Sequence, residues 1–369
     1  MTPTIAALRR YALARSLGAP ASLGAAIERL GFVQADPIRA PARAQDLILR
    51  HRVRGYRAGD LETAYPALAV EEDFFVNYGF LPRDVQALMH PRRLGAWPRP
   101  GRAVGLRVLA FVRERGEAHP RDVDAHFAHG AVTNYWGGSS TATTHVLDHL
   151  HYRGHLRILR RDRGIRVYAP RAAAPAVEHA AGRRARVDAL LDVLVALYAP
   201  VPSPTLAWLV NRLHVAAPQW RREIGDARTR AARRLAHATV DGVLWYWPAA
   251  DDPAAAEPAG DRARLLAPFD PIVWDRKRFG RFWDWDYRFE AYTPAARRKY
   301  GYYALPLLWR ERVVGWANLT VEDGRLATDL GFVGGRPRDR GFSRALDAEL
   351  AAMARFLGVS PQAVPKRTA

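Results

Sequence analysis

The sequence of 369 residues contains no cysteine and only three lysines. The absence of cysteine excludes disulfide frameworks, thiolate nucleophiles, cysteine-bound zinc and cysteine-bound iron–sulfur clusters. No apolar run approaches the roughly 18 to 20 residues that span a bilayer, and the first residues, MTPTIAALRRYALARSLG, lack a signal-peptide core. We therefore expect a cytoplasmic protein with no membrane association. The first segment then forms an amphipathic helix rather than an arginine-rich transit peptide.

Positive charge predominates in what the sequence does contain. Lysine and arginine together number 56 against 37 aspartates and glutamates, which gives a formal net charge of +19. Such an excess is typical of proteins that bind polyanions, and the planar fork of arginine suits phosphate oxygens and guanine edges. A genome of high GC content also replaces lysine by arginine, so the bias is only partly chemical. A polyanion is the expected partner, and the high isoelectric point makes nucleic acid a candidate.

A unit of three helices followed by a two-stranded hairpin recurs along the chain. In its clearest copy, apolar residues at helical spacing and helix-start signals predict helices over 104–115, 120–127 and 139–152. Two short β runs, 156–159 and 165–168, then enclose a turn that carries four charges. This order is typical of a winged helix-turn-helix.

Similar patterns occur on both sides of this copy. A further copy within 183–247 has helices over 187–198, from Ser203 and over 221–236, and a hairpin turned at Asp241-Gly242. The first copy has helices over 5–17 and 23–30 and no obvious wing. After a segment rich in proline, alanine and acidic residues, the pattern predicts strands over 302–309, 313–319 and 326–332 and a closing helix over 344–357.

These patterns together predict a mainly α fold with β wings, built from tandem winged helix-turn-helix modules and a β-rich domain. The expected modules cover 1–100, 101–172 and 183–247. A linker is expected at 248–261, and 262–369 is expected to form a small β-barrel or curled sheet with its closing helix.

The segment Gln34-Ala35-Asp36-Pro37 follows the second predicted helix, where the chain turns. Pro37 disfavours the helical region for the residue before it, so the Asp36 carboxylate is displayed from a turn or a helix start. An amide and a carboxylate two residues apart share one face of an extended stretch, and in a turn they can converge on one water. The local pattern alone favours a plainer role, in which Asp36 caps a helix that begins near Ile38.

Three long segments resemble a known family. GFVQADPIRAPARAQDLILRHRVRGY is similar to the N-terminal signature of the winged-helix DNA glycosylases of the YcaQ and AlkZ type, in which Gln-x-Asp or Gln-x-Gln follows a Gly-Phe-Val-type lead-in. LLAPFDPIVWDRKRF and YTPAARRKYGYYALPLLWRERVVGWANL resemble the family's C-terminal region. The resemblance implies tandem winged helices and a β-barrel that form a concave DNA-binding surface. It also implies excision of N-alkylated purines and, in some members, unhooking of interstrand crosslinks at guanine N7.

By this resemblance Gln34 and Asp36 are the catalytic pair of a monofunctional DNA glycosylase. An N7-alkylated purine is cationic and already a good leaving group, so its removal needs little general acid. A carboxylate stabilises the oxocarbenium-like sugar and deprotonates the attacking water. Gln34 contributes hydrogen bonds to that water or to the lesion. No lysine near the motif can form a Schiff base, and we expect no cofactor and no metal.

Basic and aromatic residues near the two signatures are candidates for contact with double-stranded, damaged DNA. Arginines flank the Gln-x-Asp motif, and a second basic run is interleaved with tyrosines, which suits phosphate contact and stacking. The predicted DNA-binding residues are Arg39, Arg43, Arg50, Arg52, Arg297, Arg298, Lys299, Tyr300 and Tyr302. Solvated arginines and a barrel strand that starts at Tyr302 are the simpler alternatives.

Two regions depart from the family pattern. The stretch 71–82 carries three consecutive acidic residues, and the stretch 134–156 is less basic than a recognition helix should be. The second stretch also holds His145, His149, His151 and His155, which lack the intervening glutamate of a zinc motif and favour a polar helix side over a metal site.

Two other functions remain open on the sequence. A non-enzymatic winged-helix DNA-binding protein or transcription regulator is the main alternative, although no dimer helix is evident and we expect a monomer. A metal-dependent nuclease would need clustered carboxylates, for which Glu71, Glu72 and Asp73 are the candidate set.

Overall fold

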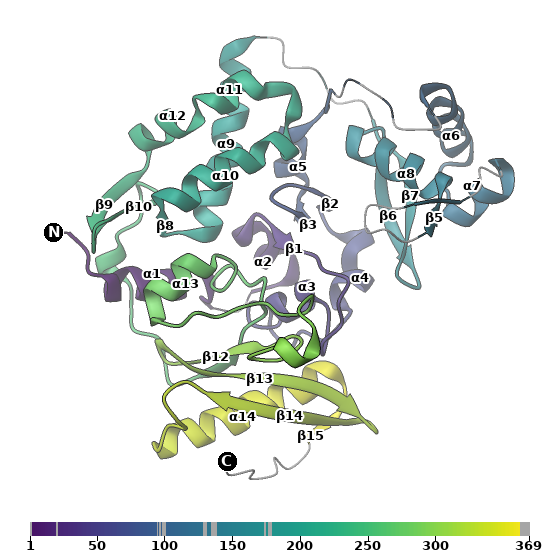
Figure 1. Ribbon diagram of the computed structural model, residues 1–369. Helices are drawn as coiled ribbons and strands as arrows, with labels where there is room; N and C mark the ends of the chain where they lie inside the picture. The colour runs from purple at the N-terminus through teal and green to yellow at the C-terminus, as the bar shows by residue number, and fades with distance from the viewer. Residues whose placement is uncertain are drawn as a thin grey trace. The chain divides into compact units, whose positions relative to one another are not determined.

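The structure, a computed structural model, describes residues 2–19, 21–93, 95, 97, 101–127, 131–133, 139–172, 175 and 179–361 (Figure 1). The chain divides into two compact units. Unit 1 comprises residues 1–61, 192–208 and 232–369, and unit 2 comprises residues 62–191 and 209–231. The divisions fall within α4 (Asp60–Ala64), α9 (Ala180–Tyr198), α10 (Ser203–Ala216) and α12 (Ala227–Arg234). The winged-helix modules and their boundaries stay a prediction.

Unit 1 begins with α1 (Ile5–Ser16) and α2 (Leu23–Leu30), followed by the short strand β1 (Val33–Gln34) and α3 (Ala44–Leu49). The hydroxyl oxygens of Thr4 and Ser22 accept hydrogen bonds from backbone N–H groups of the first turns of α1 and α2. Gly31 ends α2 at φ 69°, and a Cβ there would lie 2.5 Å from Val193 Cγ1. A glycine is therefore required where the chain leaves α2 for the Gln-x-Asp segment.

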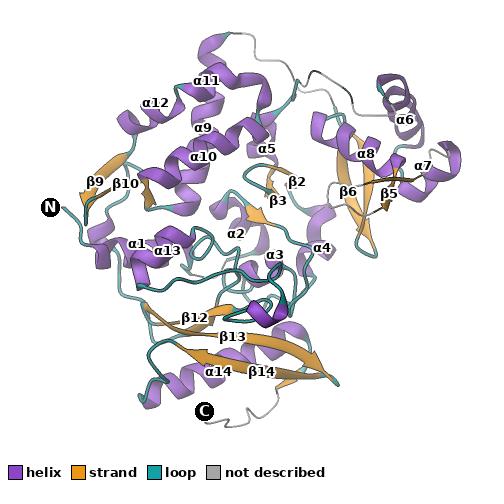
Figure 2. Cartoon of the chain, in the orientation of Figure 1, coloured by secondary structure: helices purple, strands orange, loops and turns teal. Residues whose placement is uncertain are grey.

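Apart from β1, the described strands of unit 1 form two sheets (Figure 2). One has the order β8-β10-β9 and the other the order β11-β12-β13-β14-β15. The strand order of the five-stranded sheet is open at both ends in the described residues, so of the two predicted forms, a small β-barrel or a curled sheet, the barrel is wrong. The strands are β8 (Val201–Pro202), β9 (Ala236–Val240), β10 (Val243–Trp247), β11 (Ala263–Leu265), β12 (Leu305–Trp309), β13 (Arg312–Glu322), β14 (Arg325–Phe332) and β15 (Ser360–Pro361).

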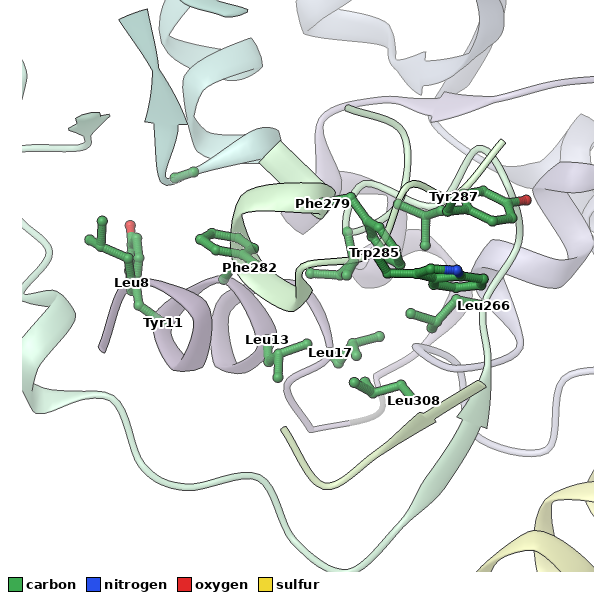
Figure 3. Packing of buried hydrophobic residues seen from close by; sticks show 14 of the residues in the cluster. Leu8, Tyr11, Leu13, Leu17, Leu266, Phe279, Phe282, Trp285, Tyr287 and Leu308 are labelled. Carbon is green, nitrogen blue, oxygen red and sulfur yellow. The ribbon is translucent and has the colours of Figure 1, made fainter. Parts of the chain in front are cut away.

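The hydrophobic core of unit 1 joins α1 to α13 (Arg276–Trp283) and the aromatic stretch that follows it (Figure 3). Phe279 and Phe282 of α13 pack in one cluster with Leu13 of α1, Trp285 and Leu308 of β12. The closing helix, α14 (Arg340–Leu357), contacts β11. Segments from the two ends of the chain thus share one core.

The predicted linker at 248–261 is bound to α1 in part. Asp251 accepts a hydrogen bond from the Tyr11 hydroxyl and forms an ion pair with Arg15. Pro253, in the single-turn helix η3 (Pro253–Ala255), is buried. Pro253 and Ala256 of this segment therefore pack against the core of unit 1, so the segment is more than a connection between domains.

In unit 2, helices α6, α7 and the hairpin β6–β7 confirm the predicted elements of the middle copy, while the predicted third helix begins at Ala142 after a strand. The predicted helix over 221–236 is interrupted at Asp226. A hairpin formed by β2 and β3 was not predicted. The unit-2 elements are η1 (Tyr65–Ala67), β2 (Val70–Phe74), β3 (Tyr78–Pro82), α5 (Arg83–Met89), α6 (Arg102–Arg115), α7 (Pro120–Phe127), β4 (Ala131–Thr133), β5 (Ser139–Thr141), α8 (Ala142–Arg153), β6 (Leu156–Asp162), β7 (Ile165–Pro170), η2 (Pro218–Trp220) and α11 (Arg221–Gly225).

Candidate active site

Asp36 lies in the turn between β1 and α3, half-buried. Its Oδ1 accepts a hydrogen bond from the backbone N–H of Ile38 at 2.9 Å. No helix begins at Ile38, because the next helix starts at Ala44, so the helix-cap interpretation is wrong. Oδ2 makes no hydrogen bond or ion pair with any described residue. One carboxylate oxygen therefore fixes the turn and the other is available to a ligand.

The electrostatic surroundings of this carboxylate leave its charge uncompensated. Burial raises the pKa of Asp36, and the hydrogen bond from Ile38 only partly opposes that effect. Among the described residues, no lysine or arginine lowers this pKa. An unpaired carboxylate with a raised pKa is a stronger base than one held by a guanidinium, and it keeps its full negative charge for a developing cation.

Backbone and amide groups hold the segment on either side of Asp36. Gln34, at the end of β1, has a side chain that is 8% exposed. The backbone N–H of Asp36 donates to Oε1 of Gln45 in α3, at 3.4 Å. Gln45 was not predicted as a site residue, and its only sequence signal is its place in the same family-like segment. Helix α3 thus anchors the turn that displays the carboxylate.

Two tyrosines from the C-terminal signature lie within the electrostatic field of Asp36. Burial raises the pKa of the Tyr303 phenol well above its usual value, and the Asp36 charge raises it further. Burial followed by the Asp36 charge also raises the pKa of Tyr292. Tyr303 is buried and its hydroxyl has no hydrogen-bond partner among the described residues, whereas Tyr292 is 75% exposed. Neither was predicted as a site residue, because the sequence gives no sign that the two signatures meet here.

Arg52 is an internal structural residue and is withdrawn from the predicted DNA contacts. Its side chain is 0% exposed and binds both carboxylate oxygens of Asp270, at 2.8 and 3.0 Å. It also donates to the backbone oxygens of Ser16 and Ile48 and to the Ser16 hydroxyl. This ion pair joins two segments that carry the family resemblance, the arginine-rich one and the Pro-Phe-Asp one, across 218 positions of sequence.

Arg50 and Tyr300 are also buried against protein partners and leave the predicted interface. Arg50 forms an ion pair with Glu349 of α14, and both side chains are almost inaccessible. The Tyr300 hydroxyl accepts from Trp285 Nε1 at 3.0 Å and donates to the backbone oxygen of Asp286 at 3.1 Å. The Arg50 guanidinium and the Tyr300 hydroxyl are therefore bound to protein groups and are not accessible to a DNA phosphate.

The other predicted DNA contacts have accessible side chains and stay a prediction. The Arg298 guanidinium lies 5.1 Å from the centre of the Tyr302 ring, which is 44% exposed, and its Nε donates to the backbone oxygen of Thr293. Lys299 lies above the ring of Tyr300. The remaining set is Arg39, Arg43, Arg297, Arg298, Lys299 and Tyr302, of which Arg43 and Arg298 are half-buried.

The acidic run in β2 is neutralised by arginines and does not form a metal site. Glu72 and Asp73 are completely buried, and Glu71 is nearly so. Arg161 pairs with Glu72, Arg92 with Asp73, and Glu71 contacts Arg83, Arg157 and Arg171. Burial opposes ionisation, yet the arginines hold the pKa of Glu72 low and, with His90, that of Asp73 well below its usual range. Within the described ranges no histidine and carboxylate group fits a metal ion. The nuclease interpretation loses its candidate residues.

The four histidines do not form a single cluster: His149 and His155 both lie against the Trp97 ring, whereas His151 packs against β2. His151 is buried, and its Nε2 is 2.9 Å from the backbone oxygen of Glu72. His149 contacts Arg153 and lies beside the Trp97 ring, and burial followed by the Arg153 charge lowers its pKa to about 4. These histidines serve packing and local hydrogen bonding. Residues 134–138 of the same stretch lie outside the described residues.

Comparison with known proteins defines the class to which this chain belongs. The family model described as "DNA glycosylase AlkZ-like" matches residues 27–356, which include Gln34, Asp36, Tyr292 and Tyr303. The chain therefore belongs to that family of DNA glycosylases, its substrate is DNA, and the family resemblance seen in the sequence is confirmed. No described helix has the length and apolar character needed to cross a membrane.

A solved structure shares the fold of the whole chain. The chain is similar to the Streptomyces sahachiroi DNA glycosylase AlkZ, with a TM-score of 0.66 and 15% sequence identity. The alignment covers 99% of this chain and 100% of that one. At this level of identity the likeness shows the fold alone.

Proposed function

We propose that this DNA glycosylase hydrolyses the N-glycosidic bond of N7-alkylated purines in double-stranded DNA, and that Asp36 directs the attacking water. The observation that carries the proposal is the unpartnered Oδ2 of a half-buried carboxylate that no cation neutralises. Interstrand crosslinks formed at guanine N7 present the same cationic leaving group and fall within the proposed substrate class.

The proposed reaction breaks the bond between C1′ and the purine and forms a bond between C1′ and the water oxygen. The bonding electrons leave with the purine and neutralise its positive charge, so no acid has to protonate the base. Asp36 accepts the water proton through Oδ2, and its charge stabilises the cationic sugar while the bond breaks. Tyr292 and Tyr303 have raised phenol pKa values and stay neutral, so neither competes with Asp36 as the base.

Gln34 has a supporting part in this proposal. Its amide can donate to the water or contact the lesion, but it has no group that can take up a proton. Gln45 fixes the Asp36 backbone, which keeps the carboxylate in one place during attack. The segment that carries Asp36 contains no lysine, so a Schiff base with C1′ finds no amine there and the strand stays intact.

The accessible basic residues near the site supply affinity that does not depend on sequence. Arginine and lysine contacts to phosphates release counterions, so we expect binding to weaken steeply with salt. The proposed set is Arg39, Arg43, Arg297, Arg298, Lys299 and Tyr302.

The proposal is tested by incubating the enzyme with duplex DNA that carries N7-methylguanine or a nitrogen-mustard crosslink. Chromatography of the released base and gel analysis of the strand are the two readouts. We expect free alkylated base and a strand that breaks only after alkaline treatment. DNA binding without base release from either substrate would instead support the non-enzymatic alternative, and strand cleavage without alkali would refute the monofunctional mechanism.

A further inference from the structure

Tyr292 is the most exposed of the large hydrophobic side chains in the described residues, at 75%, and the Asp36 charge acts on its phenol. Its ring is 6.1 Å from that of Phe289 at 78°, so the two rings are nearly perpendicular. Phe289 in turn contacts the rings of Tyr303 and Phe269. This support from one side leaves an aromatic surface of Tyr292 exposed and connects it through Phe289 to Tyr303, the second tyrosine on which the Asp36 charge acts.

The loop that carries Tyr292 is held in a fixed conformation. The Glu290 carboxylate accepts hydrogen bonds from the backbone N–H groups of Lys299 and Tyr300, at 2.9 and 2.7 Å. The N–H of Thr293 donates to the Glu290 backbone oxygen, and Arg298 donates to that of Thr293. These hydrogen bonds connect the two sides of the loop and hold Tyr292 in its exposed position in the folded protein. A ligand that stacks on the Tyr292 ring therefore has to order little of the loop.

We propose that Tyr292 is a specificity-determining residue whose ring stacks on the cationic purine while Asp36 acts at C1′ of the same nucleotide. The inference rests on the proposed function. A cation is attracted to the face of a neutral aromatic ring, and the neighbouring carboxylate increases that preference. The pair therefore favours a positively charged base over an uncharged one.

Tyr302 provides a matched control in the same signature. It is also an exposed tyrosine, but the Arg298 guanidinium already lies over its ring. A cationic base stacked on the same face of Tyr302 would be repelled by the positive charge of Arg298. Tyr302 can therefore contact DNA without distinguishing a cationic base from a neutral one.

The test measures lesion recognition apart from catalysis. Binding is compared between duplex DNA containing 2′-fluoro-N7-methylguanine, which resists hydrolysis, and the same duplex with unmodified guanine. From the usual strength of such contacts, we expect Tyr292→Leu to reduce the preference for the cationic base by about 3- to 30-fold and Tyr292→Phe to keep it. Tyr302→Leu should change both affinities by the same factor. Unchanged melting temperatures verify folding.

Two results would overturn the inference. If Tyr292→Leu keeps the lesion preference, or weakens both duplexes equally, Tyr292 is a general DNA contact. If pentafluorophenylalanine at position 292, which has the same shape and a reversed ring charge, preserves the preference, apolar packing rather than attraction of a cation is responsible. These binding results do not depend on base release, so failure of the proposed hydrolysis and failure of this inference are distinguishable.

Discussion

Replacing Arg52 by methionine should strongly destabilise the protein. The substitution keeps much of the apolar stem but removes the guanidinium, which makes bonds of 2.7 to 3.0 Å with Asp270, Ser16 and Ile48. The larger cost comes from Asp270, which is 0% exposed and would keep a buried charge without its ion-pair partner, bound among the described residues only by the backbone N–H of Ile272. Removing one member of a buried ion pair typically costs about 3 to 5 kcal/mol in the free energy of unfolding.

For a cooperative unit of about 200 residues this loss corresponds to a fall of roughly 6 to 20 °C in melting temperature. Differential scanning calorimetry measures it directly. Arg54→Met is the matched control, because Arg54 is exposed two residues further along the chain and a surface substitution changes stability by less than about 0.5 kcal/mol. The double variant Arg52→Met with Asp270→Leu should recover part of the loss, since it removes both charges.

One pattern would refute this reasoning. If Arg52→Met melts like the native protein and loses affinity for DNA, Arg52 contacts DNA and is not an internal ion-pair partner.

The remaining predictions concern ionisable groups in both units. Burial raises the pKa of Asp36, and hydrolysis needs its ionised form, so kcat/KM should fall in acid with an apparent pKa above the value of roughly 3.9 for a free aspartate. An apparent pKa at or below that value would contradict the account. Tyr303→Phe removes a buried hydroxyl that has no partner, so urea denaturation should show unchanged or higher stability, up to about 1 kcal/mol; a loss above that size would mean that the hydroxyl is bonded. The arginines lower the folded-state pKa of Glu72 and Asp73, so these carboxylates stabilise the fold above the ordinary carboxylate pKa. The free energy of unfolding should therefore fall as the pH drops through about 5 to 3. A free energy of unfolding that stays constant over this pH range would refute this prediction.

Local signals predicted several elements well. Proline at a helix start, followed by apolar spacing, placed the helix over 120–127 where α7 lies. Asp-Gly marked the turn between β9 and β10, where Asp241 has φ 48°. The effect of Pro37 on Asp36 likewise predicted that the carboxylate is displayed from a turn. These features depend on neighbours in the sequence, which is why they could be read from it.

Features that depend on distant residues could not be predicted. Three acidic residues argue against a strand, and β2 forms because arginines such as Arg161, 89 positions away, neutralise them. Arg52 and Arg54 look alike in sequence, and only the position of Asp270 separates a buried residue from an exposed one. The sequence also did not show that the Asp36 charge acts on Tyr292 and Tyr303, more than 250 positions away.

The most direct test of the account compares base release by the native protein and by Asp36→Asn under single-turnover conditions. Asparagine keeps the shape but cannot take up the proton or stabilise the cationic sugar. We predict a fall in rate of at least about 100-fold, with DNA affinity within a few-fold of native. Melting temperature should be unchanged or higher, because the substitution removes a half-buried, unpaired charge. Base release at the native rate would contradict the central role of Asp36, as would a parallel loss of DNA binding and activity.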